Sequence, residues 1–140
     1  MKAFLNPRQV KQVWNYACVG SKAYSIAKDF LGARIEYSKY DQDDLQGWCA
    51  EYVIPPKILN QECGKPVNPV TEANIRVINI KNYYANNGHR NGEYCTFYKY
   101  SGDKNIKMTA YQVSKISDEG IKALKLEYGL SDEFLESYFK

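Results

Sequence analysis

The sequence has little of what metal or cofactor chemistry needs. It contains one histidine, His89, and its cysteines Cys18, Cys49, Cys63 and Cys95 include no Cys-x-x-Cys pair. A structural zinc site requires closely spaced cysteine or histidine ligands, usually as two short-spaced pairs. The chain also lacks a Walker motif, a dinucleotide-binding fingerprint and a zinc-protease pair. We therefore expect neither a metal nor a cofactor.

Long apolar segments are missing as well. No run approaches the ~20 apolar residues that cross a bilayer, and no apolar segment of a signal peptide follows Met1. These absences predict a cytoplasmic protein with no membrane contact, in which the cysteines stay reduced. With 140 residues, the chain is predicted to form a single domain over residues 1–140.

Two helices are expected in the first quarter of the chain. Asn6 can cap a helix that runs to residue 18, with Pro7 in its first turn. Ser21 can cap a second helix that runs to residue 31, where Gly32 ends it. The pair resembles a helix-turn-helix motif. However, Tyr16 stands where that motif needs a small residue, and a strand is expected next.

From residue 34 onward the apolar residues change to an alternating pattern, which predicts strands. Residues 34–40 and 48–54 both fit a strand. Between residues 55 and 69 the chain is rich in proline, and Gly64 adds a further breaker. This segment is therefore predicted to be an ordered loop with little regular structure.

The clearest strand signal lies in the second half of the chain. Residues 74–84 and 93–100 are predicted to form a hairpin, because the connector between them holds two Asn-Gly steps. Residues 106–116 are predicted to add an adjacent strand, and Ser117 and Ser131 can cap two final helices. The predicted fold class is α+β, with two N-terminal helices, a mostly antiparallel sheet of four or five strands and two short C-terminal helices.

Charge is arranged in blocks along the chain. Residues 1–34 carry six basic side chains against one acidic, and residues 73–116 carry seven basic against two acidic. The second block is also rich in tyrosine. Cations bind phosphates and aromatic rings stack on bases, so this combination is typical of a sheet that binds single-stranded nucleic acid. The candidate binding residues are Arg76, Lys81, Tyr83, Tyr84, His89, Arg90, Tyr94, Tyr98, Lys99, Tyr100, Lys104 and Lys107.

These features favour a non-catalytic binding protein whose partner is anionic, namely nucleic acid. A nucleic-acid-handling protein is an alternative partner, because its basic groove could meet the acidic blocks at residues 41–44 and in the C-terminal helices. In character the chain is similar to small phage-encoded inhibitors of host defence systems, although no motif carries that analogy.

Two other functions are compatible with the sequence. A metal-independent ribonuclease could use His89 as general base, with Arg90 or Lys81 stabilising the developing charge and Glu93 or Tyr84 as the second acid-base group. A self-associating accessory protein could form a homo-oligomer through an aromatic sheet edge or the terminal helix. Since the spacing specifies no catalytic pair, we expect binding rather than catalysis.

Overall fold

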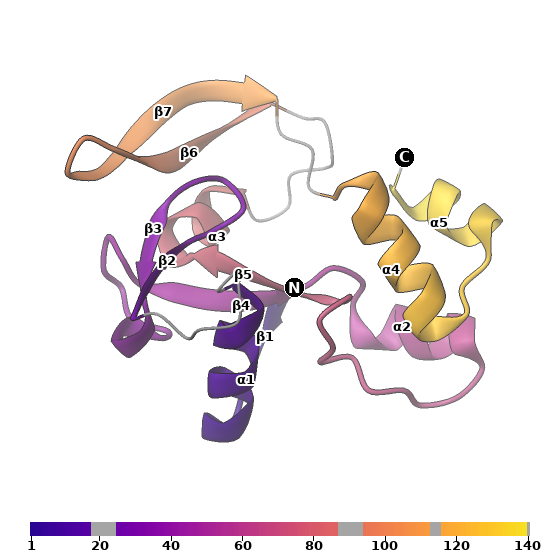
Figure 1. The fold of residues 1–140 in the computed structure, drawn as a ribbon. Helices are drawn as coiled ribbons and strands as arrows, with labels where there is room; N and C mark the ends of the chain where they lie inside the picture. The colour runs from indigo at the N-terminus through magenta and orange to yellow at the C-terminus, as the bar shows by residue number, and fades with distance from the viewer. Residues whose placement is uncertain (18–24, 87–93, 113–115, 140) are drawn as a thin grey trace.

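The structure is a computed structural model that describes residues 1–17, 25–86, 94–112 and 116–139. Its strands are β1 (Lys2–Ala3), β2 (Ile26–Lys28), β3 (Arg34–Glu36), β4 (Trp48–Tyr52), β5 (Ile75–Asn79), β6 (Tyr94–Ser101) and β7 (Lys104–Gln112). Its helices are α1 (Pro7–Ala17), α2 (Pro56–Cys63), α3 (Ile80–Asn86), α4 (Asp118–Tyr128) and α5 (Asp132–Phe139), and η1 (Tyr37–Lys39) is a 3-10 helix. The predicted α+β class is confirmed (Figure 1).

Small separate sheets replace the single sheet that was predicted. In the described ranges, one sheet has the order β1-β4-β5, and β2-β3 and β6-β7 form two further antiparallel pairs. The prediction of a single sheet is wrong because α3 begins directly after β5. The run predicted as a strand over residues 74–84 therefore ends as a strand at Asn79 and continues as a helix. The hairpin predicted between residues 74–84 and 93–100 is wrong for the same reason. Its Asn-Gly connector lies outside the described residues.

Helix α1 confirms the first predicted helix. The Asn6 side chain accepts a hydrogen bond from the Gln9 N–H at 2.8 Å, and the Gln9 side chain accepts one from the Asn6 N–H at 3.0 Å. This reciprocal pattern is a capping box. The helix buries Trp14 against Trp48 of β4, with ring centroids 5.1 Å apart, and so covers one face of the three-stranded sheet.

The second predicted helix is wrong over its described part. Residues 25–31 form β2 and the start of a turn, because Ile26 to Lys28 pair with Glu36 to Arg34 of β3. Gly32, at φ +91°, reverses the chain between the two strands, a conformation that favours glycine. The helix-turn-helix resemblance fails with this helix.

The C-terminal helices are confirmed, and an additional helix packs beside them. Ser117 and Ser131 accept hydrogen bonds from the N–H groups three residues later, both at 3.1 Å. The loop predicted over residues 55–69 is wrong over residues 56–63, because Pro56 occupies the first turn of α2, where a missing N–H costs nothing. Residues 64–69 have no regular structure, as predicted. Leu59 of α2 is buried with Leu124 of α4 and other apolar side chains. Helices α2, α4 and α5 therefore form one group (Figure 1).

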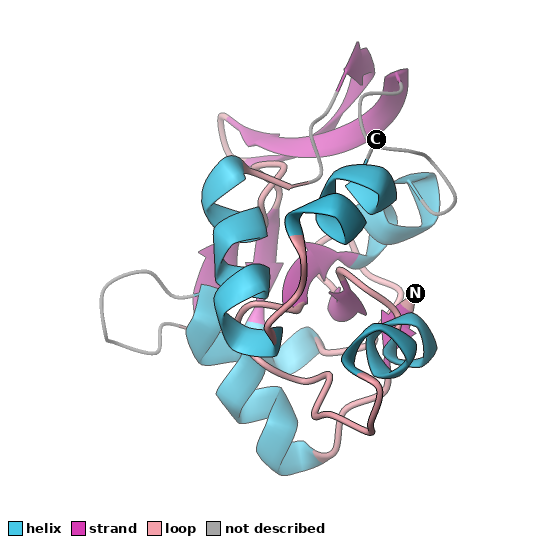
Figure 2. Cartoon of the chain, turned by 90° about the vertical axis from the view of Figure 1, so that its right-hand side faces the viewer, coloured by secondary structure: helices cyan, strands magenta, loops and turns pink. Residues whose placement is uncertain are grey.

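The β6–β7 hairpin lies at one end of the molecule. In Figure 1 it arches over the rest of the fold with β7 as the outer strand, and Figure 2 shows it at the same end from the side. Among the side chains that the structure describes, Phe97 and Met108 of the hairpin pack with Leu31 of the body. None of the helices in the described ranges is long and apolar enough to cross a membrane.

Candidate functional site

A buried carboxylate organises the contact between the hairpin and the body. The side chain of Asp29 accepts hydrogen bonds from the N–H groups of Leu31 at 3.0 Å, Ala33 at 2.8 Å and Asn79 at 2.9 Å. It also accepts one from the side-chain amide of Asn82 at 3.0 Å. Burial raises the pKa of Asp29 above its ordinary value, and the hydrogen bonds, first that of Asn82, oppose this shift. The carboxylate joins the β2–β3 turn to the start of α3.

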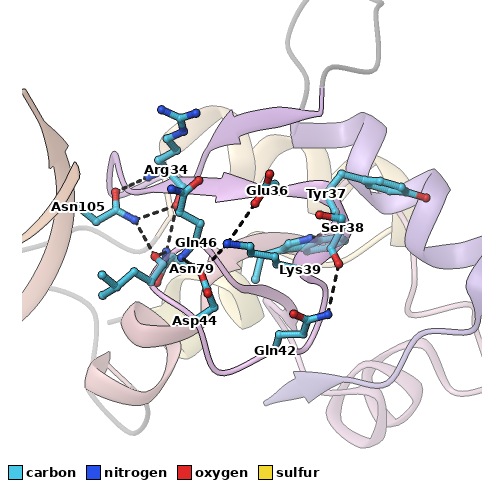
Figure 3. A network of polar contacts seen from close by, with 12 residues as sticks. Arg34, Glu36, Tyr37, Ser38, Lys39, Gln42, Asp44, Gln46, Asn79 and Asn105 are labelled. Carbon is cyan, nitrogen blue, oxygen red and sulfur yellow. Dashed lines mark hydrogen bonds and ion pairs between the residues drawn. The ribbon is translucent and has the colours of Figure 1, made fainter. Parts of the chain in front are cut away.

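Two asparagines fix the same region from the other side. The amide of Asn79 donates to the carbonyl oxygens of Arg34 at 3.1 Å and Leu45 at 2.8 Å. The amide of Asn105, on β7, donates to the same two oxygens at 3.0 and 2.7 Å, and its side-chain oxygen accepts from the Arg34 N–H at 2.8 Å. Figure 3 shows both amides converging on the main chain of Arg34. Directed polar contacts therefore hold this part of the hairpin on the body.

The inner edge of β6 is hydrogen-bonded to the body. The side chain of Asn82 accepts from the Tyr98 N–H at 2.5 Å and donates to the Tyr98 carbonyl oxygen at 2.9 Å. Two residues later, the Tyr100 N–H donates to the Gly32 carbonyl oxygen at 2.9 Å. Because alternate residues of a strand direct their N–H and C=O groups to the same edge, these contacts leave β7 as the outer edge of the hairpin.

Two cations share one aromatic ring where the hairpins meet. Lys28 and Arg34 are direct cross-strand partners in the β2–β3 pair. The Lys28 Nζ lies 5.6 Å and the Arg34 Cζ 5.3 Å from the centroid of the Tyr100 ring, and Arg34 Nη1 donates to the Tyr100 hydroxyl at 3.1 Å. Like charges directly opposite each other in a sheet are destabilising, and contact with an aromatic ring offsets only part of that cost. An anion between the two cations would offset more.

The same site holds an unsatisfied donor. Arg34 Nε is buried and has no hydrogen-bond partner among the described residues. A buried N–H without a partner costs about 1–3 kcal/mol. Such groups in a native fold call for an explanation, and one common explanation is a ligand or ion that binds there.

Three further lysines lie on the outer hairpin, Lys107 on the face of the Tyr100 ring and Lys99 and Lys104 on the opposite face. Lys99, Lys104 and Lys107 are exposed on β6 and β7. Lys107 lies directly across from Tyr98, and Lys104 across from Ser101. We call the set of these lysines with the cross-strand pair the basic surface; its members are Lys28, Arg34, Lys99, Lys104 and Lys107.

No member of the basic surface forms an ion pair with a described side chain. The acidic residues described in the same two hairpins are Asp29, Glu36 and Asp103, and Glu36 forms an ion pair with Lys39 at 3.3 Å. Asp29 is buried and its oxygens are occupied by N–H donors, and Asp103 is exposed in the turn of the hairpin. The basic surface therefore keeps a positive balance that the fold does not neutralise.

Two of the predicted binding cations are, in contrast, neutralised. Arg76 donates from both Nε and Nη2 to Glu51, at 3.1 and 2.6 Å, and its guanidinium lies 4.2 Å from the centroid of the Phe30 ring. Lys81 forms an ion pair with Asp43. Arg76 and Lys81 therefore have acidic partners, whereas the lysines of the hairpin have none among the described side chains.

The predicted aromatic residues are not gathered on one surface. Tyr83 is only 8% exposed and packs with Cys49 and Ile78 on the sheet face opposite α1. Tyr84 is 63% exposed on α3, and Tyr98 and Tyr100 are half-buried. Of the remaining candidates, Tyr94 is described only as the first residue of β6. His89 and Arg90 lie outside the described residues.

Lys28 and Arg34 are not among the binding residues predicted from the sequence. The sequence places Lys28 in the helix predicted from Ser21 to residue 31, where it would not face Arg34. The signal that could have found it is the turn at residues 29–32: an aspartate followed by a glycine between two short runs that each carry a cation. A hairpin through that turn places Lys28 opposite Arg34.

A second concave region is less suited to a ligand. An open cavity of about 340 Å³ lies between β5 and the start of α4, and Phe30, Ile75, Arg76 and Ser117 contribute to its lining. Its one charged group, Arg76, is already paired with Glu51. Ligand sites usually combine apolar walls with several convergent polar groups, and the described lining does not provide them.

Comparisons with known proteins add no assignment, because no family model, curated protein or solved structure matches the chain.

Proposed function

We propose that this chain is a non-catalytic binding protein whose basic surface engages the phosphates of a nucleic acid. The observation that carries the proposal is the cross-strand pair of Lys28 and Arg34, which share the Tyr100 ring and have no acidic partner among the described side chains. A phosphate between them would relieve their mutual repulsion and could accept from Arg34 Nε after a small rearrangement.

The contrast with other cations of the fold supports this interpretation. Lys2, Lys39 and Lys125 pair with Asp41, Asp44 and Asp132, as Arg76 and Lys81 pair with their own acidic partners. A chain with many acidic residues could pair the cations of the basic surface in the same way, but no ion pair joins them to an acidic side chain within residues 1–17, 25–86, 94–112 and 116–139. Clustered, uncompensated positive charge raises the local concentration of polyanions and accelerates their association.

The alternative of a basic protein partner has less support. Of its two acidic blocks, residues 41–44 are already engaged, since Asp41, Asp43 and Asp44 each form an ion pair with a lysine. The block in α4 and α5 stays exposed at Asp118, Glu119 and Glu133. The hydrogen bond from the Gln46 N–H, and after it the bond from Lys39, hold the pKa of Asp44 below its ordinary value. We therefore place nucleic acid first and a nucleic-acid-handling protein second. The analogy with phage-encoded inhibitors remains open under either partner.

The test is fluorescence anisotropy with labelled DNA in both single-stranded and duplex form. We expect the double variant Lys104→Ala/Lys107→Ala to weaken binding about 10-fold or more, because each lost phosphate contact removes a share of the electrostatic affinity. The matched control is Lys57→Ala/Lys65→Ala, which removes the same charge at exposed positions in and after α2. Equal losses in the two variants, or no binding by the wild-type protein, would contradict the proposal.

A further inference from the structure

Resting on the proposed function, we infer that the Lys28 and Arg34 pair is a site for the terminal phosphate monoester of a nucleic-acid strand, rather than for the internal phosphodiesters of its backbone. Three features carry the inference. One edge of the Arg34 guanidinium has no acceptor, the charges and donors of the pair match a monoester, and part of the site lies below the surface.

One edge of the Arg34 guanidinium lacks an acceptor. A guanidinium binds an oxyanion best through two neighbouring N–H donors. In Arg34, Nη1 is engaged, because it donates to the Tyr100 hydroxyl at 3.1 Å. Nε is buried, and no hydrogen bond joins Nε or Nη2 to a residue in the described ranges. The edge formed by Nε and Nη2 is therefore the part of the guanidinium that a ligand can satisfy.

Arg76 shows the same arrangement with its anion in place. Its guanidinium lies 4.2 Å from the centroid of the Phe30 ring, and its Nε and Nη2 donate to the Glu51 carboxylate at 3.1 and 2.6 Å. The guanidinium of Arg34 lies 5.3 Å from the centroid of the Tyr100 ring. Arg34 thus has the aromatic ring of this arrangement but not the oxyanion.

The acidic residues nearest to the pair in sequence do not supply that oxyanion. Glu36 lies two residues beyond Arg34 and on the same face of β3, but it pairs with Lys39 at 3.3 Å. Asp29, which follows Lys28, is buried, and its oxygens accept N–H groups. Lys28 is exposed and Arg34 is half-buried, so an anion can approach the pair from solvent.

The charge and the donors of the pair fit a phosphate monoester better than a phosphodiester. Lys28 and Arg34 are direct cross-strand partners and bring two positive charges together. An internal phosphodiester carries one negative charge, whereas a monoester carries about −1.5 to −2 at neutral pH and has three accepting oxygens. Nε and Nη2 of Arg34 and Nζ of Lys28 provide donors for all three oxygens. A terminal phosphate would therefore neutralise both cations.

The depth of the site also favours the end of a strand. Arg34 Nε is buried, and Asn105, whose side chain accepts from the Arg34 N–H at 2.8 Å, is only 8% exposed. An internal phosphate has a nucleotide on both sides, whereas a terminal phosphate is attached on one side only and can enter a narrower recess. Lys104 and Lys107 stay exposed and add positive charge for further phosphates, which favours a nucleic acid over a small monoester.

The experiment compares single-stranded DNA probes that differ at their ends, each measured by fluorescence anisotropy with the whole chain. The first carries a terminal phosphate, at the 5′ end in one sample and at the 3′ end in another. The second has hydroxyl ends. The third has hydroxyl ends and one more nucleotide, so its number of phosphates equals that of the first. We expect a terminal phosphate at one or both ends to strengthen binding about 10-fold over both hydroxyl-ended strands.

The outcomes separate the inference from the proposed function. If the longer hydroxyl-ended strand binds as tightly as both phosphorylated strands, the terminal phosphate acts only as additional charge. That result overturns the inference, but the proposed function stands. If no strand binds, the proposed function is wrong as well.

A phosphoserine peptide tests whether the monoester belongs to a protein instead. The peptide carries the same monoester group without a nucleotide backbone. We expect it to bind at least about 10-fold more weakly than the phosphorylated strand, because Lys104 and Lys107 then have no further phosphates to attract. A peptide that binds as tightly as the phosphorylated strand would contradict a nucleic acid as the ligand.

Substitutions locate the preference for a terminal phosphate. Lys28→Gln removes one cation, and Arg34→Lys keeps the charge but removes the edge formed by Nε and Nη2. We expect each to reduce the preference to about twofold or less. Lys104→Gln is the matched control, since it removes an exposed cation from the other face of the hairpin. It should weaken all strands equally and leave the preference unchanged. An equal reduction of the preference in Lys104→Gln and Lys28→Gln would overturn the inference.

Discussion

The side-chain amide of Asn82 binds the main chain of Tyr98 as a neighbouring strand would. It accepts from the Tyr98 N–H at 2.5 Å and donates to the Tyr98 carbonyl oxygen at 2.9 Å, while its second N–H reaches Asp29 at 3.0 Å. One side chain thus joins the buried carboxylate to the hairpin. The orientation of the basic surface depends on this contact together with the packing of Phe97 and Met108 on Leu31.

Removal of this amide should loosen the hairpin. We expect Asn82→Ala to lower the free energy of unfolding by about 2–4 kcal/mol, because buried donors and acceptors on Tyr98 and Asp29 lose their partner. Urea denaturation measures the change in the free energy of unfolding. In the Asn82→Ala variant, the Tyr98 amide should exchange its hydrogen fastest. Gln42→Ala is the control, since it removes one long, exposed hydrogen bond at 3.4 Å. Equal effects in both variants would show that Asn82 is not the anchor.

The carboxylate of Asp29 should resist replacement by its amide isostere. Both of its oxygens accept N–H groups, so Asp29→Asn must turn an NH₂ group toward two donors. We expect a loss of about 1–3 kcal/mol in the free energy of unfolding at neutral pH. Asp103→Asn, in the exposed turn of the hairpin, should change stability by less than about 0.5 kcal/mol. An equally small effect at Asp29 would contradict this role.

The wild-type protein and the Asp29→Asn variant should also differ in how their stability depends on pH. Burial raises the pKa of Asp29 above its ordinary value of 3.8. The cost of burying the charge is therefore present in full above the folded-state pKa and is relieved as the pH falls through it. Asp29→Asn lacks this titration. The stability of the wild-type protein relative to the variant should rise as the pH is lowered from 7 toward 4, and a constant difference would contradict the raised pKa.

Close packing at Gly47 should make that position intolerant of a side chain. An added Cβ would lie 2.0 Å from the Gln42 carbonyl oxygen and 3.1 Å from Ile80 Cγ2. We expect Gly47→Ala to cost about 2–4 kcal/mol in the free energy of unfolding, since the main chain of the loop must move. Gly64→Ala meets no atom within 4 Å and carries only the strain of φ +68°, about 1 kcal/mol. Thermal or urea unfolding measures the loss of stability in both variants. Equal losses would contradict the close approach of Gly47 to the Gln42 carbonyl oxygen.

The two described thiols should differ in reactivity. Cys49 is buried in the sheet, and burial raises its pKa to about 12, so little thiolate forms at neutral pH. Cys63 is half-buried in α2. Mass spectrometry after brief iodoacetamide treatment of the folded protein should find Cys63 modified well before Cys49. Modification of Cys49 at the same rate would mean that this part of the sheet opens readily.

Local signals in the sequence predicted the elements whose ends are fixed by their own side chains. The capping residues Asn6, Ser117 and Ser131 each bind the N–H three residues later, so the helices they begin are confirmed. Strand β4 is also confirmed, because Trp48 to Ala50 are buried on both faces of the sheet and give a continuous apolar run. In these segments local and tertiary preferences agree.

The errors arise where long-range contacts outweigh local spacing. Ile26 and Phe30 have helical spacing, yet both are exposed, and Asp29 instead accepts N–H groups from its own turn and from Asn79, 50 residues away. No local pattern reports such a partner. The candidate site was predicted only in part for the same reason. The lysines of the hairpin were predicted, but Lys28 could not be placed opposite Arg34 until the turn at Asp29 was known.

The most direct test of the basic surface is the salt dependence of binding to the DNA duplex by the wild-type protein and by Lys28→Gln. Five cations on phosphates of the duplex predict a slope of log K against log[salt] of about −4.5. Lys28→Gln should reduce this slope by about one while leaving the free energy of unfolding within about 0.5 kcal/mol, because it also relieves a like-charge pair. A wild-type slope near zero, or a slope that Lys28→Gln does not change, would contradict phosphate binding at this site.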